Sequence, residues 1–156
     1  MKAIVDFVAK FGTKIPLNTD FVVKKDGRYF LLNGILKRFI RDDYYYAGTY
    51  LGKMKDGIFF PSFNLLAWIG RRRANSVVID RKASWLFICG RDIFRKSILS
   101  VNVSPGKNDY VLVLNEFKEC LGFGRIVSSL NAAGKGADPA VRNISDIGDF
   151  LRRETR

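Results

Sequence analysis

The residues that could do chemistry in this chain are its 27 lysines and arginines, which outnumber 15 acidic residues and leave a formal net charge of +12. Up to Gly70 there are 11 basic and 6 acidic residues, and after it there are 16 and 9, so both halves are positive. An excess of this size is typical of proteins that bind nucleic acid or an anionic membrane. Because the sequence contains no strongly basic amphipathic helix, we expect nucleic acid as the partner and no membrane.

The sequence offers no familiar catalytic or cofactor site. It contains no histidine, which removes Ser-His-Asp and Cys-His catalysis and the usual zinc sites. Cys89 and Cys120 form no CxxC pair, and we expect both to be buried in a reducing compartment, which favours a cytoplasmic protein. Gly122-Phe123-Gly124 does not open a helix, and Gly134-Lys135 lacks the rest of a phosphate-binding loop. We therefore expect no enzyme, no cofactor and no small-molecule substrate.

Periodicity and turn residues predict the elements of the first half. Apolar residues spaced by three and four predict a helix over 2–11, and Asp-Gly pairs predict hairpins joining 21–23 to 28–32 and 44–51 to 58–60. Short helices are expected over 34–40 and 61–69. The run Tyr44–Tyr46 is either one face of a sheet, partly buried with one ring exposed, or an exposed patch for a protein partner. Arg71–Arg73 is either a solvated helix end or a phosphate contact.

Short strands and one buried helix are predicted after this arginine run. A strand is expected over 77–79, and Asp80 is a plausible N-cap for a largely buried helix over 81–89. Alternating residues predict strands over 98–103, 110–114 and 120–127, a loop over 128–140, a strand over 141–144 and a helix over 146–153. Such short strands indicate a closed or nearly closed barrel. The predicted fold class is α+β, with an antiparallel α/β domain over 1–72 followed by a β pseudo-barrel over 73–156.

The stretch from Ala83 to Val127 resembles the PUA domain, a small RNA-binding module. The resemblance rests on an apolar helix leading into Gly90-Arg91-Asp92, on two strands around Pro105-Gly106, and on the glycine-spaced run from Leu121 to Arg125. It covers about residues 75–150. It implies that the pseudo-barrel is of the PUA type and that the C-terminal domain binds RNA.

Three segments narrow this resemblance. Residues 50–70, 121–127 and 137–155 look like the Nip-seven family of large-ribosomal-subunit biogenesis factors, in the compact, histidine-free form of an archaeal member. The resemblance implies a non-catalytic protein that acts in the processing of pre-ribosomal RNA. Its implied partners are single-stranded segments of pre-rRNA and the pre-ribosomal large subunit, with other assembly factors or the exosome in addition.

The candidate RNA-binding residues are all basic. Five lie in the segments that resemble the family or beside them, and three on the Gly90 loop, where PUA domains commonly meet RNA: Lys135, Arg142, Arg152, Arg153 and Arg125, then Arg91, Arg95 and Lys96. Arginine offers a planar fork of donors to phosphate, whereas lysine offers a point charge. Asp92 is expected to pair with one residue of the loop. Phe123 could form a stacking platform with Arg125, although a place in the barrel core is favoured.

Two other classes of protein also contain a PUA domain. A PUA-containing translation factor would bind tRNA or the small ribosomal subunit. An RNA-modifying enzyme would need a catalytic domain larger than the about 70 residues that precede the barrel. The sequence therefore favours a non-catalytic RNA-binding factor of large-subunit biogenesis.

Overall fold

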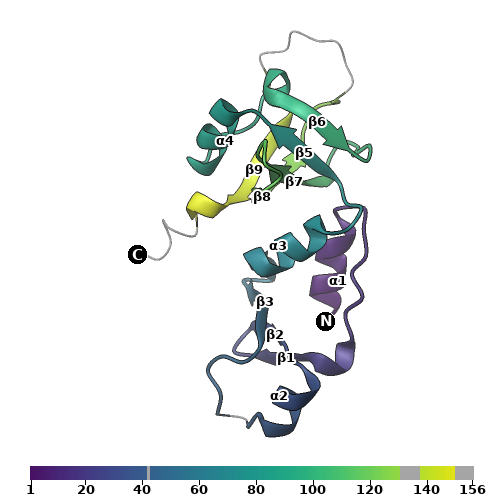
Figure 1. Cartoon of the computed structure of the whole chain (residues 1–156), viewed down its shortest axis with the longest axis vertical. Coiled ribbons are helices and arrows are strands. Elements are labelled where there is room, and N and C mark those ends of the chain that lie inside the picture. The colour runs from purple at the N-terminus through teal and green to yellow at the C-terminus, as the bar shows by residue number, and fades with distance from the viewer. Residues whose placement is uncertain (42, 131–137, 150–156) are drawn as a thin grey trace.

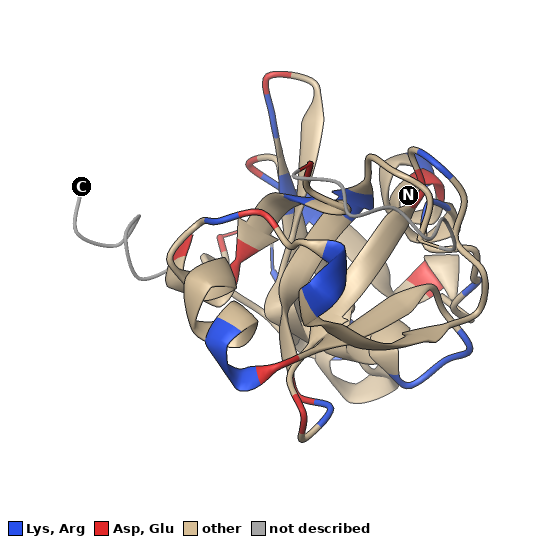
Figure 2. Cartoon of the chain, turned by 90° about the horizontal axis from the view of Figure 1, so that it is seen from above, with Lys and Arg blue, Asp and Glu red and all other residues tan. Residues whose placement is uncertain are grey.

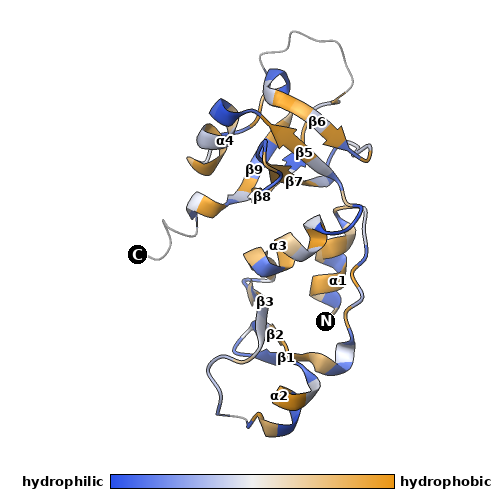
Figure 3. Ribbon diagram, viewed as in Figure 1, coloured by the Kyte–Doolittle hydropathy of each residue, from blue (hydrophilic) through white to orange (hydrophobic). Residues whose placement is uncertain are grey.

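The computed structural model describes residues 1–41, 43–130 and 138–149, and it has the predicted α+β architecture. Two sheets lie at opposite ends of an elongated molecule (Figure 1), with helices α1 (Lys2–Ala9) and α3 (Phe63–Gly70) between them. The hydrophobic segments of these helices fill the middle of the molecule (Figure 3). No helix in the described ranges has the length and apolar character needed to cross a membrane.

The N-terminal sheet is a four-stranded antiparallel meander. Its strands β1 (Val22–Lys25), β2 (Arg28–Leu31), β3 (Thr49–Lys55) and β4 (Ile58–Pro61) follow one another in space as in sequence. Both predicted Asp-Gly turns have positive φ at their two central residues, with 47° and 74° in the first and 51° and 75° in the second. This conformation matches the twist of a hairpin, which explains the register. Helix α2 (Gly34–Phe39) connects β2 to the segment before β3.

The tyrosine run differs from its prediction. The strand expected from residue 44 begins only at Thr49, so Tyr44–Tyr46 lies in the preceding loop. Tyr44 and Tyr46 place their rings against Phe30, with centroids 6.1 and 5.1 Å away. Two rings are exposed rather than one, since Tyr45 and Tyr46 are 75% and 58% accessible.

The C-terminal sheet has five strands in the order β6-β5-β7-β8-β9. They are β5 (Ser76–Ile79), β6 (Ile98–Asn102), β7 (Tyr110–Leu114), β8 (Cys120–Ile126) and β9 (Val141–Asp146), and only the β5–β7 pair is parallel. Helix α4 (Arg81–Ile88) begins at Asp80, whose carboxylate accepts a hydrogen bond of 2.8 Å from the amide of Ala83. The N-cap prediction is therefore confirmed. Short 3-10 turns lie at Thr19–Phe21 and Arg95–Ser97.

One hydrophobic core joins the two sheets. Phe7 of α1 contacts Phe59 of β4 and Phe123 of β8 edge to face, at centroid distances of 5.3 and 5.4 Å. Leu65 and Leu66 of α3 belong to the same cluster. A second core fills the pseudo-barrel around Val77, Phe87 and Val111. The division expected between residues 72 and 73 stays a prediction, and residues from both sides of it build the first core.

Two burial predictions are wrong. Helix α4 was expected to be buried on most sides, but Trp85 and Leu86 are 66% and 42% exposed because only its Ala83–Phe87 side packs on the barrel. Cys89 follows this helix and is exposed, whereas Cys120 is half-buried. The predicted helix over 146–153 begins at residue 147. Its remainder from residue 150 lies outside the described residues.

Candidate nucleic-acid interface

Strand β8 places Arg125 at the centre of a basic cluster. Two glycines let β9 lie close against β8: a Cβ on Gly122 would meet the backbone of Ser145, and one on Gly124 would lie 2.6 Å from the carbonyl oxygen of Arg142. The register then sets Arg125 directly opposite Arg142 in β9 and opposite Tyr110 in β7. Two of the predicted RNA-binding residues are thus cross-strand neighbours on one face of the sheet.

Within the described part of the chain, little offsets the repulsion between the positive charges of Arg125 and Arg142. Like charges directly opposite each other on a sheet are destabilising. Arg142 is exposed and Arg125 is half-buried, and the Nε of Arg125 is buried with no hydrogen-bond acceptor among the described residues. A buried donor without an acceptor costs about 1–3 kcal/mol. An anion bound by the two guanidinium groups would offset the repulsion.

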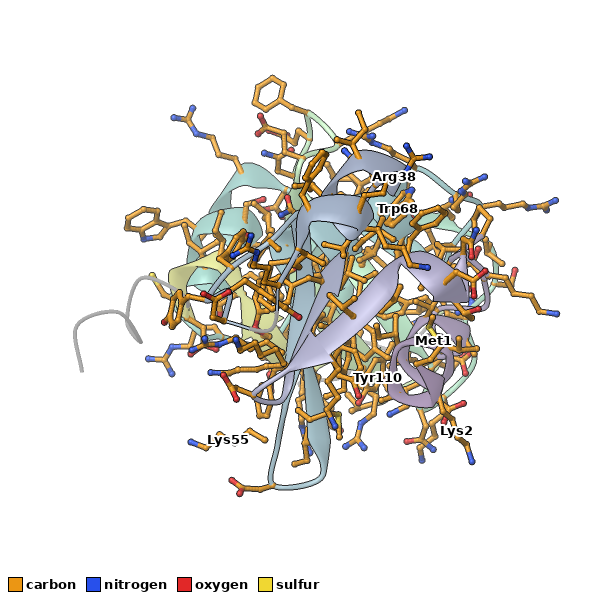
Figure 4. All side chains as sticks on the ribbon, turned by 90° about the horizontal axis from the view of Figure 1, so that it is seen from below. Met1, Lys2, Arg38, Lys55, Trp68 and Tyr110 are labelled. Atoms are coloured by element: carbon orange, nitrogen blue, oxygen red, sulfur yellow. The ribbon has the colours of Figure 1, made fainter. Side chains whose placement is uncertain are left out.

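Lys10, which directly follows α1, adds a third positive charge to this face. Its Nζ lies 4.8 Å from the centroid of the Tyr110 ring, which is a cation–π distance. Tyr110 lies beside α1 (Figure 4), and its ring also contacts Phe11, with centroids 5.7 Å apart. We call Lys10, Arg125 and Arg142 with Tyr110 the basic face. Sequence reasoning missed Lys10 and Tyr110, because the contact between α1 and β7 joins residues about a hundred positions apart.

The Gly90 loop lies along the edge of β9 that faces away from β8. Ile93 pairs with Val141 through backbone hydrogen bonds of 2.8 and 3.1 Å. The carboxylate of Asp92 accepts a hydrogen bond of 2.8 Å from the amide of Asn143, so Asp92 anchors the loop to β9. The expectation that Asp92 pairs with a basic residue of the loop finds no support in this contact. The loop is therefore held next to Arg142 by residues that are not themselves basic.

The three basic residues of the Gly90 loop have different surroundings. Arg91 and Lys96 are exposed, as a phosphate contact requires. Arg95 is half-buried and donates a hydrogen bond of 2.9 Å from Nη1 to the carbonyl of Leu130, which ties the loop to the segment after β8. Its contact with RNA stays a prediction.

Three other predicted RNA-binding residues can be assigned neither to the basic face nor to the Gly90 loop. Lys135, Arg152 and Arg153 lie outside the described residues. Phe123, considered as a stacking platform, is 3% exposed; it is buried as favoured, but in the core that joins the two sheets and not in the core of the pseudo-barrel. Across the molecule, lysines and arginines are spread over several sides (Figure 2), so local geometry distinguishes the basic face better than overall charge does.

Arginine and lysine side chains such as those of the basic face can bind anions. No cluster of three or more potential metal ligands occurs among the described residues. Burial raises the pKa of the Cys120 thiol to about 11, which keeps it protonated and unreactive near neutral pH. Burial also raises the pKa of Tyr50, and the nearby charge of Arg28 partly opposes this rise.

Comparison with known proteins agrees with this architecture. A solved PUA-domain protein from Thermoplasma acidophilum is similar at a TM-score of 0.61 and 23% identity, over 99% of this chain and 93% of that one. A hypothetical protein from Pyrococcus horikoshii is similar at a TM-score of 0.62 and 16% identity, over 99% and 96%. A PUA domain from Aeropyrum pernix, solved as a tartrate complex, has a TM-score of 0.58 at 18% identity, over 94% and 82%. These similarities show the fold.

Sequence comparison identifies the family. A UPF0113 protein from Archaeoglobus fulgidus is 31% identical over 112 residues, which are 70% of this chain and 63% of that protein. The chain thus matches less than two thirds of that relative's length. The family model of the UPF0113 PUA domain matches residues 75–155, which contain the whole C-terminal sheet, the Gly90 loop and every residue of the basic face except Lys10. The chain belongs to the UPF0113 PUA-domain family.

Proposed function

We propose that this protein is a non-catalytic RNA-binding factor that uses the basic face, which its PUA domain builds together with Lys10. The observation that carries the proposal is the Arg125–Arg142 pair, which opposes two like charges and leaves a buried donor of Arg125 without an acceptor among the described residues. RNA phosphates that contact the two guanidinium groups would offset the repulsion between them. A PUA domain itself suggests RNA binding, and the exposed Arg91 and Lys96 extend the positive surface along β9.

We further propose that its RNA is the precursor of large-subunit ribosomal RNA. This step rests on the resemblance of residues 121–125 and 146–152 to the Nip-seven family. The partners would be single-stranded segments of pre-rRNA in the pre-ribosomal large subunit, with assembly factors or the exosome beside it. Unpaired RNA is the favoured form because its bases and phosphates are both accessible to side chains. The protein would act in the cytoplasm.

Crosslinking in native extract, followed by sequencing of the bound RNA and sedimentation of the tagged protein, tests this assignment. We expect crosslinks to large-subunit pre-rRNA and sedimentation with large-subunit precursors. Crosslinks to tRNA and stable sedimentation with small subunits would identify a translation factor instead. Modified nucleosides formed by the purified chain on substrate RNA would show that it is an enzyme.

A further inference from the structure

A cleft of about 650 Å³ opens between the N-terminal sheet and the pseudo-barrel. It is lined by Lys10 at the end of α1, Phe59 of β4 and Tyr110 of β7, with Lys53 of β3 and Ile144 of β9 also at its walls. Its volume lies within the range of about 300–1,000 Å³ that is typical of small-ligand sites. Residues from both halves of the chain therefore build one cleft.

The inner wall of the cleft is aromatic. Phe7 forms its centre, with ring centroids 5.3 Å from Phe59 and 6.1 Å from Tyr110. Phe59 and Tyr110 are half-buried, so each ring keeps part of its surface accessible from the cleft. Accessible rings beside positive charge are the features with which proteins hold unpaired bases.

The charges at the cleft favour an anionic chain. Lys10 and Lys53 line it together with one acidic residue, Asp6. Tyr110 joins the cleft to the basic face, because it lines the cleft and is the cross-strand neighbour of Arg125. A base held against Tyr110 would thus lie beside the residue that pairs with Arg125.

We propose that the cleft receives the base of an unpaired nucleotide of the bound RNA, while the flanking phosphates lie on the basic face. This inference rests on the proposed function and adds a base-binding site that includes β4 of the N-terminal sheet. The positive rim distinguishes this ligand from an apolar side chain of a partner protein, which would need no lysine at either wall.

Photo-crosslinking with the whole chain tests the site. An unpaired oligoribonucleotide with single 4-thiouridine substitutions at successive positions is bound, irradiated and analysed by peptide mass spectrometry. We expect one register to crosslink to peptides that contain Phe59 or Tyr110. An abasic nucleotide at that register should weaken binding about 5- to 150-fold, the range that one base–aromatic stack contributes.

A matched pair of variants separates the cleft from its surroundings. Ile144→Trp fills the cleft, whereas Ile147→Trp adds the same indole three residues further on, at a side chain that does not line it. The two isoleucines are similarly exposed, at 41% and 43%. We expect Ile144→Trp to remove the crosslink to β4 and the penalty of the abasic nucleotide, and Ile147→Trp to keep both.

The outcomes separate the two proposals. RNA binding without crosslinks to β4, together with equal affinity for intact and abasic RNA, would overturn the base site and leave the proposed function standing. Displacement of the β4 crosslink by free uridine monophosphate with no change in RNA affinity would also overturn it, since the cleft would then take a free nucleotide. Capture of a protein segment in the cleft that leaves RNA binding intact would do the same. No RNA binding by the folded chain would remove the proposed function itself.

Discussion

Neutralising the Arg125–Arg142 pair should weaken RNA binding and flatten its dependence on salt. Each arginine that neutralises one phosphate of a single strand contributes about 0.7 to the slope of log K against log salt concentration. Because the pair supplies two such contacts, its loss should lower the slope by about 1.4, which amounts to about 25-fold in affinity at 0.1 M relative to 1 M salt. Arg125→Met with Arg142→Met keeps most of the aliphatic stem while it removes both charges.

Fluorescence anisotropy with an unpaired oligoribonucleotide over a range of salt concentrations measures both quantities. The control is Lys37→Met with Arg38→Met, which removes the same charge from helix α2 at the far end of the molecule (Figure 1). The control should keep the wild-type slope within experimental error. Equal losses in the two double variants would show that only overall charge matters. An unchanged slope in a folded Arg125/Arg142 variant would refute the basic face outright.

Three further predictions concern residues that lie around the basic face. Asp92→Ala should lower the free energy of unfolding, measured in urea, by about 1–3 kcal/mol, because it leaves the Asn143 amide without its acceptor. A decrease of less than about 0.3 kcal/mol would show that this hydrogen bond does not hold the loop. Gly122→Ala should cost about 2–6 kcal/mol, from a φ of +147° and a clash with the Ser145 backbone. In the same assay Gly57→Ala, at a φ of +75° with open space, should cost only about 1–2 kcal/mol, and equal costs would contradict the clash. Iodoacetamide at pH 8 should label the exposed Cys89 in the native protein, but it should label Cys120 only after unfolding. The reason is that the thiolate is the reactive form and that burial raises the pKa of Cys120 to about 11. Rapid labelling of Cys120 in the native protein would contradict this prediction.

Local sequence rules predicted most of the elements. Asp26-Gly27 and Asp56-Gly57 require positive φ and so determine their hairpins, and Asp80 caps α4 through a contact three residues away. Alternation placed β7 and β8 with errors of about one residue at their ends. These signals act within a few residues, which is why they can be read from a single sequence.

The parts that were missed depend on long-range packing. The apolar composition of α4 predicts a buried helix. The exposure of Trp85 depends instead on which side of α4 packs against the barrel. Lys10 reaches the basic face only because Phe7 and Phe11 pack α1 on β7 and β8. The Arg125–Arg142 pairing depends on the bulged register between β8 and β9, which shifts between Phe123 and Gly124. Residue types therefore identified candidate residues, and only the register showed that two of them are neighbours.

Nuclear magnetic resonance of the arginine side chains tests RNA binding at this face most directly. The Nε–H signals of Arg125 and Arg142 are assigned by single Arg→Lys replacement and followed during titration with the unpaired oligoribonucleotide. Phosphates that contact the two guanidinium groups change the surroundings of these protons, so we predict that the Arg125 and Arg142 signals shift while the signal of Arg38 stays in place. RNA binding that leaves both the Arg125 and Arg142 signals unshifted would contradict this assignment.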